Sequence, residues 1–256
     1  PGIDEVLMFP PTYGMYKVAA NINNVSVKEV ALTTDFQLNM IQIKSAINHR
    51  IKLIFICSPN NPTGNLIKLR DLMELARVFK GIIVIDEAYI DFTESNSWIE
   101  AIPKFPHIVV LQTLSKAWGL ASLRLGMAFC NRDLVDVMNM IKSPYNISGL
   151  IQNQVLMALK QEDRMRSFVE EIKELKRELQ SALQQIPFIL KIYPSDANFF
   201  LVKFKDAQNV FQHLINNGVI IRDRSGSVLC EDCLRITVGT SFENKQLILA
   251  LHNYLK

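Results

Sequence analysis

The stretch KLIFICSPNNPTGNLIKLRDLMELARVFKGIIVID, residues 52–86, indicates the fold class of this protein. It begins with an apolar run at 52–57 and ends with another at 81–86, and neither run alternates with polar residues. Such runs are typical of strands in a sheet that is covered on both faces. The residues between the runs have apolar side chains at helical spacing, and Gly81 marks the expected end of this helix. The stretch therefore predicts a βαβ unit with two parallel strands.

The same pattern of short apolar runs continues on both sides of this unit. Runs at 5–9, 107–112 and 125–130 predict three more strands without polar alternation. A chain that alternates strands with helices is typical of an α/β fold. We therefore expect a three-layer α/β domain, with a mostly parallel sheet and helices on both of its faces.

The character of the sequence changes near residue 150. The chain continues with one long helical stretch, in which Glu and Lys recur three and four residues apart, as on a solvated helix face. Short strands and helices are then expected at 188–194, 197–204, 206–217, 218–223, 233–239 and 242–255. We therefore predict two domains, a large one of residues 1–150 and a smaller α+β domain of residues 151–256.

The composition favours a small-molecule ligand over a nucleic acid or a membrane. Of the 256 residues, 28 are basic and 25 are acidic, and the two signs are mixed along the chain. This leaves no basic stripe of the kind that binds nucleic acids by counterion release. No apolar run reaches the ~18 residues of a membrane span, and the N-terminus has no signal-peptide pattern. We expect a soluble, cytoplasmic protein.

The four cysteines predict no metal site. Cys230 and Cys233 form one C-x-x-C, but Cys57 and Cys130 lie far from it in the sequence, and the four histidines are scattered. Because a zinc site would need a second pair of ligands, ordinary reduced thiols are the expectation.

Polar residues follow three successive predicted strands. Asn61 follows the first in SPNNPTG, and Asp86 and Tyr89 follow the second in DEAYIDF. The third strand leads into TLSKAWGLASLRLG, which contains Ser115, Lys116 and Arg124. Taken one by one, such residues are also typical of tight turns and helix caps. Ligands of open α/β sheets bind at the carboxyl ends of strands, so the regular spacing of about one βα unit predicts a shared site.

In this order, the three segments resemble the asparagine, aspartate and cofactor-lysine segments of the aspartate-aminotransferase-like, fold-type I family of pyridoxal-phosphate enzymes. Within that family, further segments resemble the histidinol-phosphate aminotransferases. They are PPTYGMY (10–16), CSPNNPTG (57–64), SPYNIS (143–148), DANFFLVKF (196–204) and CLRITVGT (233–240). The resemblance runs through essentially the whole chain.

The resemblance implies pyridoxal phosphate as the cofactor and assigns catalytic roles to Lys116, Asp86 and Tyr89. Lys116 would bind the cofactor covalently and later act as general acid and base, with burial and nearby cations lowering its pKa. Asp86 would pair with the pyridine nitrogen and keep it protonated. Asn61 and Tyr89 match the donors to the ring 3-oxygen.

The cofactor phosphate and the face of its ring have their own expected ligands. Ser115 and Arg124 match a hydroxyl donor and a bidentate guanidinium that bind the phosphate. Thr113 is a further hydroxyl candidate, and equally an ordinary β-branched residue at a strand end. Tyr13 matches the aromatic residue that stacks on the ring, although a tyrosine in a Pro-Gly turn also has a purely structural explanation.

The expected substrate ligands lie in the second half of the chain. Arg235 matches the arginine that binds the substrate's carboxylate, because its planar fork suits that anion. Arg222 would add charge for a phosphate group, with a surface salt bridge to Asp223 or Asp232 as the alternative. Asn198 is expected to support the same edge of the site.

We therefore predict a histidinol-phosphate transaminase of the histidine biosynthetic pathway. It would act on histidinol phosphate, glutamate and 2-oxoglutarate by a ping-pong mechanism, as a homodimer. Other readings are an aromatic-amino-acid aminotransferase, a threonine-phosphate decarboxylase, and the aminotransferase-like ligand-binding domain of a regulator. Because the family's glycine-rich phosphate turn and N-terminal arm lie before PPTYGMY, we expect this chain to be the remainder of a longer protein.

Overall fold

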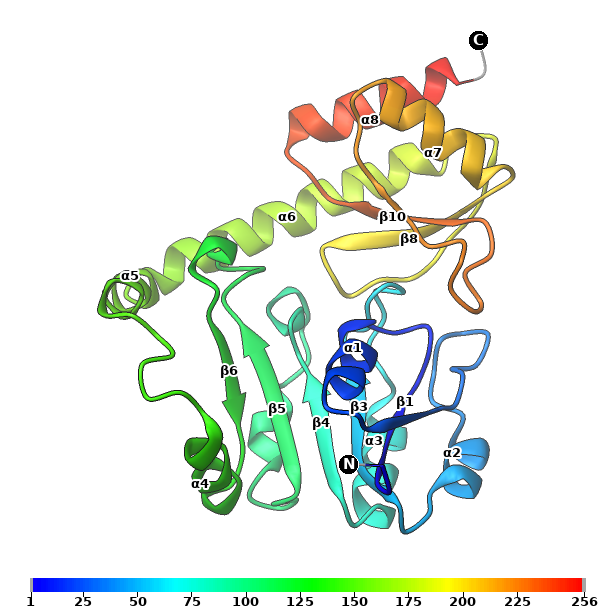
Figure 1. Ribbon diagram of the computed structural model, residues 1–256. Helices are drawn as coiled ribbons and strands as arrows, with labels where there is room; N and C mark the ends of the chain where they lie inside the picture. The colour runs from blue at the N-terminus through cyan, green and yellow to red at the C-terminus, as the bar shows by residue number, and fades with distance from the viewer. Residues whose placement is uncertain (1, 255–256) are drawn as a thin grey trace.

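The computed structural model describes residues 2–254 and contains two β-sheets (Figure 1). The larger has six strands in the order β2-β1-β3-β4-β5-β6. Its strands are β1 Glu5–Met8, β2 Ser26–Glu29, β3 Ile51–Cys57, β4 Ile82–Asp86, β5 Ile108–Thr113 and β6 Gly126–Phe129. Neighbouring strands from β2 to β5 pair in parallel, and β6 pairs with β5 antiparallel. The expected mostly parallel α/β sheet is confirmed.

Strand β2 is the strand that the sequence pattern missed. Its residues, SVKE, include no apolar run, and the strand is partly exposed at the edge of the sheet. An edge strand with so little buried surface carries no hydrophobic signal. Its position is determined by backbone pairing with β1.

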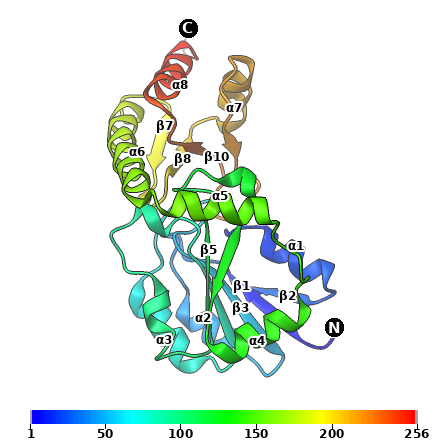
Figure 2. The same cartoon turned by 90° about the vertical axis from the view of Figure 1, so that its left-hand side faces the viewer.

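The helices that flank the larger sheet are α1 Met15–Ile22, α2 Met40–Ala46, α3 Leu69–Val78 and α4 Arg132–Ile141. Helices α1 and α3 lie on opposite faces of the sheet, as the two perpendicular views show (Figures 1 and 2). The strands β1, β3, β4 and β5 are largely buried, as expected for a sheet covered on both faces. The expectation is wrong for β6, where Gly126 and Ala128 are exposed.

The predicted helix between β3 and β4 is present, but Gly81 is not its stop signal. Helix α3 ends at Val78, and Phe79 follows in an extended conformation. A Cβ atom on Gly81 would lie 2.6 Å from the carbonyl oxygen of Lys52, on the neighbouring strand. Glycine therefore allows close strand approach at this position, which is a different use of the same residue.

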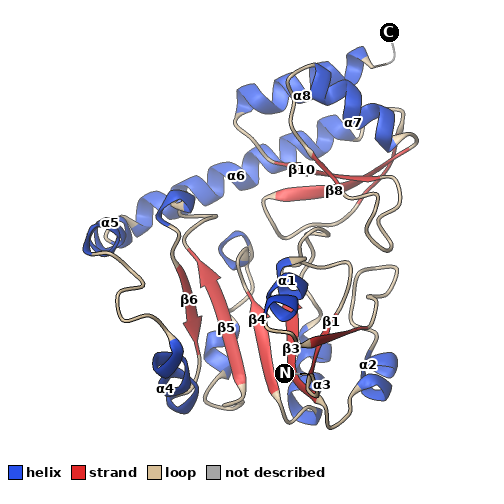
Figure 3. Cartoon of the chain, viewed as in Figure 1, coloured by secondary structure: helices blue, strands red, loops and turns tan. Residues whose placement is uncertain are grey.

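The second half of the chain forms a four-stranded antiparallel sheet with its own helices (Figure 3). The strands, in the order β7-β8-β10-β9, are β7 Ile189–Ile192, β8 Phe199–Phe204, β9 Arg222–Asp223 and β10 Cys233–Thr237. The helices are α5 Gly149–Leu159, α6 Glu162–Leu183, α7 Ala207–Asn216 and α8 Ser241–Asn253. The single long helical stretch expected after residue 150 is therefore wrong, because α5 and α6 are separate helices.

The two sheets share buried contacts. Leu201, Cys230 and Cys233, from the second half of the chain, belong to the same hydrophobic cluster as the strands of the larger sheet. Helix α6 extends from the neighbourhood of α5 to the smaller sheet (Figure 1). The division into domains at 1–150 and 151–256 stays a prediction. We retain it because a separate cluster, which includes Phe204 and Leu214, fills the space between the smaller sheet and its helices.

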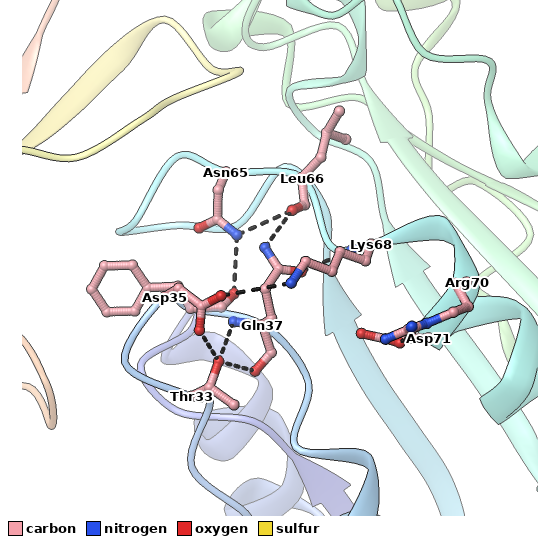
Figure 4. A network of polar contacts seen from close by, with 9 residues as sticks. Thr33, Asp35, Gln37, Asn65, Leu66, Lys68, Arg70 and Asp71 are labelled. Atoms are coloured by element: carbon pink, nitrogen blue, oxygen red, sulfur yellow. Dashed lines mark hydrogen bonds and ion pairs between the residues drawn. The ribbon is translucent and has the colours of Figure 1, made fainter.

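A polar network holds the segment that directly follows the SPNNPTG turn (Figure 4). The side chain of Gln37 donates to the carbonyl of Leu66 (3.1 Å) and accepts from the backbone N–H of Lys68 (2.8 Å). Asn65 donates to the carbonyl of Phe36 at 3.0 Å. These contacts position the turn that carries Asn61 at the end of β3.

Within residues 2–254, no helix is long and apolar enough to cross a membrane. The same residues contain no group of three or more His, Cys, Asp or Glu side chains that could hold a metal ion. All four cysteines are free thiols.

Candidate active site

A cavity of about 990 Å³ lies at the carboxyl ends of β3, β4 and β5 and is also lined by residues of the smaller sheet. The predicted site residues that line it are Tyr13, Asn61, Asp86, Tyr89, Thr113, Ser115, Lys116, Arg124, Arg222 and Arg235. Asn198 does not line the cavity, and its backbone carbonyl accepts a hydrogen bond from the N–H of Val238 (2.9 Å). The structure therefore does not bring Asn198 to the substrate edge where it was expected.

Asp86 is the last residue of β4 and is held by two donors. The Tyr16 hydroxyl donates to Oδ2 at 2.6 Å, and the Ala88 N–H donates to Oδ1 at 3.1 Å. Burial raises the pKa of Asp86, whereas these two hydrogen bonds and the charge of Lys116 act to lower it. The carboxylate thus has a fixed plane and donors that favour its ionised form.

Lys116 lies in the turn after β5, with Nζ 5.3 Å from the centroid of the Tyr89 ring. Desolvation, followed by the charges of Arg235 and Arg124, lowers the pKa of Lys116, and Asp86 opposes this shift. The side chain is nevertheless exposed in the structure, on the wall of an open cavity. The expectation of a buried amine is therefore wrong, while the expected direction of the pKa shift agrees with the cation-rich surroundings.

Arg235 and Asn61 meet across the cavity, although they come from different sheets. Nη1 of Arg235 donates to Oδ1 of Asn61 at 2.7 Å, which leaves Nδ2 as the remaining hydrogen-bonding group of Asn61. The guanidinium lies 4.9 Å above the ring of Phe199, and Tyr89 contacts the same ring edge-on at 5.1 Å. Burial raises the pKa of Tyr89 to about 12, with Arg235 acting to lower it, so the phenol stays a donor at neutral pH.

Two hydroxyls and a guanidinium line the cavity beyond the end of β5. Oγ1 of Thr113 lies 3.0 Å from Oγ of Ser115 and accepts from the Ser115 N–H at 3.2 Å. Arg124 has a left-handed backbone conformation, with φ of 54°. Its Nη1 donates to the carbonyl of Ala121 at 2.9 Å. An arginine at positive φ is uncommon and frequently marks a functional position. These groups together can bind an anion.

Tyr13 follows β1 and is 41% exposed at the cavity wall. Its ring meets that of Tyr16 edge-on, with centroids 5.6 Å apart. Met15 and Val18, from the start of α1, line the cavity beside it. The position suits a ring that stacks on a planar ligand, and that role of Tyr13 stays a prediction.

Arg222 also lines the cavity, and the alternative of a surface salt bridge has no support. Among the residues that the structure describes, Arg222 forms no ion pair with a carboxylate. The Asp223 carboxylate instead accepts from the backbone N–H of Ser225 at 2.8 Å. Arg222 therefore adds a positive charge to the same wall as Arg235.

Two residues with polar contacts at the site were missed from the sequence: Tyr16, which donates to Asp86, and Arg224, which lines the cavity. Tyr16 lies in the same PPTYGMY segment as Tyr13, three positions later. Arg224 lies two positions after Arg222, a spacing that places side chains on one side of an extended segment. Both signals were present in the sequence, but neither identifies the partner of the side chain.

The donor set fits pyridoxal phosphate. A fixed carboxylate, an amine of lowered pKa and an anion-binding wall surround one cavity of sufficient size for a planar, phosphorylated ring. Nε of Arg224 and Nε of Arg235 are buried without a hydrogen-bond partner in the described part of the chain. Such buried donors are expensive unless a ligand accepts from them.

The chain is similar to curated histidinol-phosphate aminotransferases. The histidinol-phosphate aminotransferase of Flavobacterium psychrophilum is 47% identical over 251 residues, which cover 98% of this chain and 72% of that protein. The enzyme of the same name from Cytophaga hutchinsonii is 47% identical over 254 residues, which cover 99% of this chain and 73% of that protein.

Solved structures show the same fold at lower identity. A histidinol-phosphate aminotransferase from Clostridium acetobutylicum has a TM-score of 0.92 at 22% identity, covering 98% of this chain and 78% of that one. A histidinol-phosphate aminotransferase from Sinorhizobium meliloti, in complex with pyridoxal-5'-phosphate, has a TM-score of 0.90 at 20% identity. The match covers 98% of this chain and 70% of that one. A family model described as aminotransferase class I and II matches residues 1–251. The chain therefore belongs to the aminotransferase class I and II family.

Proposed function

We propose that this protein transfers an amino group between histidinol phosphate and 2-oxoglutarate, with pyridoxal phosphate as its cofactor. The observation that carries the proposal is one cavity that combines the Asp86 carboxylate and the Lys116 amine with a wall of three arginines, Arg222, Arg224 and Arg235. The names of relatives that are 47% identical support the same substrate.

When bound, pyridoxal phosphate supplies an electron sink for the bond that breaks at the substrate Cα. In our proposal, Asp86 would pair with the ring nitrogen and stabilise its positive charge, because its two donors favour the ionised carboxylate against the effect of burial. Nδ2 of Asn61 and the Tyr89 hydroxyl would be the donors to the ring oxygen. Tyr13 would stack on one face of the ring.

Lys116 is the proposed nucleophile and proton carrier. Its lowered pKa increases the fraction of neutral amine at a given pH, and only the neutral amine attacks a carbonyl carbon. As a free amine, Nζ could accept a proton and return it at another atom, as general base and then general acid. The proposed ligands of the cofactor phosphate are Ser115 and Arg124, with Thr113 as a supporting hydroxyl.

The arginines on the opposite wall are the proposed substrate ligands. Arg235 suits a carboxylate or a phosphate, because its planar fork can form two parallel hydrogen bonds. The further charges of Arg222 and Arg224 match the dianion of a phosphate monoester. The same arginines can bind the carboxylate of glutamate, which has a smaller charge than the phosphate dianion, in the other half-reaction.

The proposal includes a homodimer in the cytoplasm. Large apolar side chains are exposed on α4, α5 and the segment between them, among them Met140, Ile141, Tyr145 and Leu150, which are 77 to 92% exposed. Exposed apolar surface of this extent is typical of an interface, and we propose that a second copy of the chain covers it. The four free thiols suit a reducing compartment.

The test is an absorbance titration of the purified protein with pyridoxal phosphate, followed by borohydride and peptide mapping. We expect a cofactor band that borohydride traps on Lys116, and conversion of the band by histidinol phosphate. A band that responds to phenylalanine but not to histidinol phosphate would identify an aromatic aminotransferase. Release of carbon dioxide from threonine phosphate would identify a decarboxylase, and absence of any trapped adduct would contradict the cofactor assignment.

A further inference from the structure

The hydroxyl of Tyr16 is directed at the carboxylate that the proposed function places beside the cofactor ring. Tyr16 lies in the first turn of α1 and is 6% exposed. Its ring stacks on Phe55 of β3, with centroids 5.0 Å apart and planes 13° apart, and Tyr13 meets it edge-on. Contacts on two sides of the ring therefore fix where the hydroxyl points, which is Oδ2 of Asp86 at 2.6 Å.

The proton of this hydrogen bond belongs to Tyr16. Burial, and then the neighbouring Cys57 and Asp86, raise the pKa of Tyr16 well above its ordinary value. Burial also raises the pKa of Cys57 to about 12, so the thiol next to the pair is neutral. Burial raises the pKa of Asp86, whereas the Tyr16 hydrogen bond and the charge of Lys116 act to lower it. With the phenol as the donor, the carboxylate is the acceptor. A hydrogen bond to the charged form of a group favours that form.

We propose that Tyr16 is a positioning residue that keeps Asp86 ionised and oriented toward the ring nitrogen of the cofactor. The inference rests on the proposed function, because it concerns how that site binds its cofactor. Together with the Ala88 N–H, the Tyr16 hydroxyl leaves each carboxylate oxygen with one protein donor. Both oxygens keep a lone pair free for a further donor, such as a protonated ring nitrogen.

This role separates the hydroxyl of Tyr16 from its ring. If the residue only filled space between α1 and β3, phenylalanine would serve equally, because the contacts with Phe55 and Tyr13 involve the ring alone. Loss of the hydroxyl would leave a buried carboxylate with one donor fewer, and its pKa would rise. The resulting loss of affinity should be confined to ligands that carry a basic nitrogen opposite Asp86.

The test compares Tyr16→Phe with the wild-type protein in binding two ligands, pyridoxal phosphate and its deaza analogue, in which carbon replaces the ring nitrogen. We expect Tyr16→Phe to lower the affinity for pyridoxal phosphate by about 10- to 100-fold, as for other residues that orient a ligating group. The affinity for the deaza analogue should stay unchanged. Tyr254→Phe is the matched control, because the Tyr254 hydroxyl faces Asp206 at 3.4 Å in the smaller sheet's core, away from the cavity.

The two affinities of Tyr16→Phe test the positioning role. An equal loss of affinity for both ligands, or an unchanged affinity for pyridoxal phosphate, would overturn it. A second variant, with 4-aminophenylalanine in place of Tyr16, keeps a neutral donor at the same point and should bind pyridoxal phosphate nearly as the wild type does. It also tests the idea if Tyr16→Phe proves unfolded. Failure of the wild-type protein to bind pyridoxal phosphate would instead contradict the proposed function.

Discussion

Arg235 and Asn61 are 174 positions apart in the sequence, yet Nη1 of one donates to Oδ1 of the other at 2.7 Å. Asn61 belongs to the turn after β3 of the larger sheet, and Arg235 lies in β10 of the smaller one. This hydrogen bond joins the two sheets at the cavity. The remaining donors of the guanidinium are the ones that we propose for the substrate.

Replacing Arg235 with lysine should therefore impair activity even though the charge remains. Lysine cannot bond Asn61 and bind a carboxylate with a parallel pair of donors at the same time. We expect kcat/KM for both substrates to fall by about 10- to 150-fold, corresponding to about 1.5–3 kcal/mol for a charge-assisted hydrogen bond. Steady-state kinetics measure this, with Arg177→Lys on the exposed face of α6 as the control. Activity within twofold of wild type would contradict it.

Arg222→Gln and Arg224→Gln should distinguish the two substrates. Each removes one positive charge from the wall that we propose for the phosphate group. The KM for histidinol phosphate should rise by more than the KM for glutamate, because a phosphate dianion interacts more strongly with a cation than a carboxylate does. The comparison requires both half-reactions, followed by the absorbance of the cofactor. Equal effects on the two substrates would contradict the assignment.

Lys116→Met should abolish transamination and stabilise the cofactor-free protein. The lysine lies near the cations Arg235 and Arg124, and desolvation and these charges lower its pKa. Removing the positive charge should raise the free energy of unfolding by about 0.5 kcal/mol, a small gain because the open cavity screens the charges. Thermal unfolding of the two cofactor-free proteins measures it. Lys160→Met, at an exposed position after α5, should leave the melting temperature unchanged.

Lys176 on α6 should make the stability of the folded protein depend on pH. Its ammonium donates to the carbonyls of Ser195 and Ala197, both at 2.6 Å. Burial lowers the pKa of Lys176 to about 8, with Asp196 opposing the shift. The unfolded chain therefore binds more protons than the folded one between pH 8 and about 10.4, so stability due to this group rises with pH across that window. Relative to Lys176→Met, the melting temperature of the wild type should increase from pH 8 to about pH 10.

Lys173→Met, one turn away on the same helix, is the matched control for this profile. Although desolvation acts to lower it, hydrogen bonds to Glu94 and Glu170 raise the pKa of Lys173. The stability from that group is present below its unfolded pKa and is lost only as the pH rises through the higher folded value. Its removal should therefore change the melting temperature equally at pH 8 and pH 9. A parallel pH profile for the wild type and Lys176→Met would contradict the assignment.

The local sequence pattern alone was enough to predict five of the six strands in the larger sheet and the places where polar residues lie at strand ends. Four of its strands are buried apolar runs. Asp86 at the end of β4, with Asn61 and Lys116 in the turns after β3 and β5, lies at one edge. These features are local, because burial on both faces selects apolar residues and parallel pairing aligns the strand ends. The motif order therefore sufficed to predict the family.

Which side chains meet depends on how distant segments pack in three dimensions. The pairs Tyr16 with Asp86 and Arg235 with Asn61 depend on how α1 and β10 pack against the larger sheet, and no local pattern encodes such a distance. The open surroundings of Lys116 likewise result from the cavity between the two sheets. Residue types and their spacing indicate which chemistry is available, whereas packing between distant segments determines which groups act on one another.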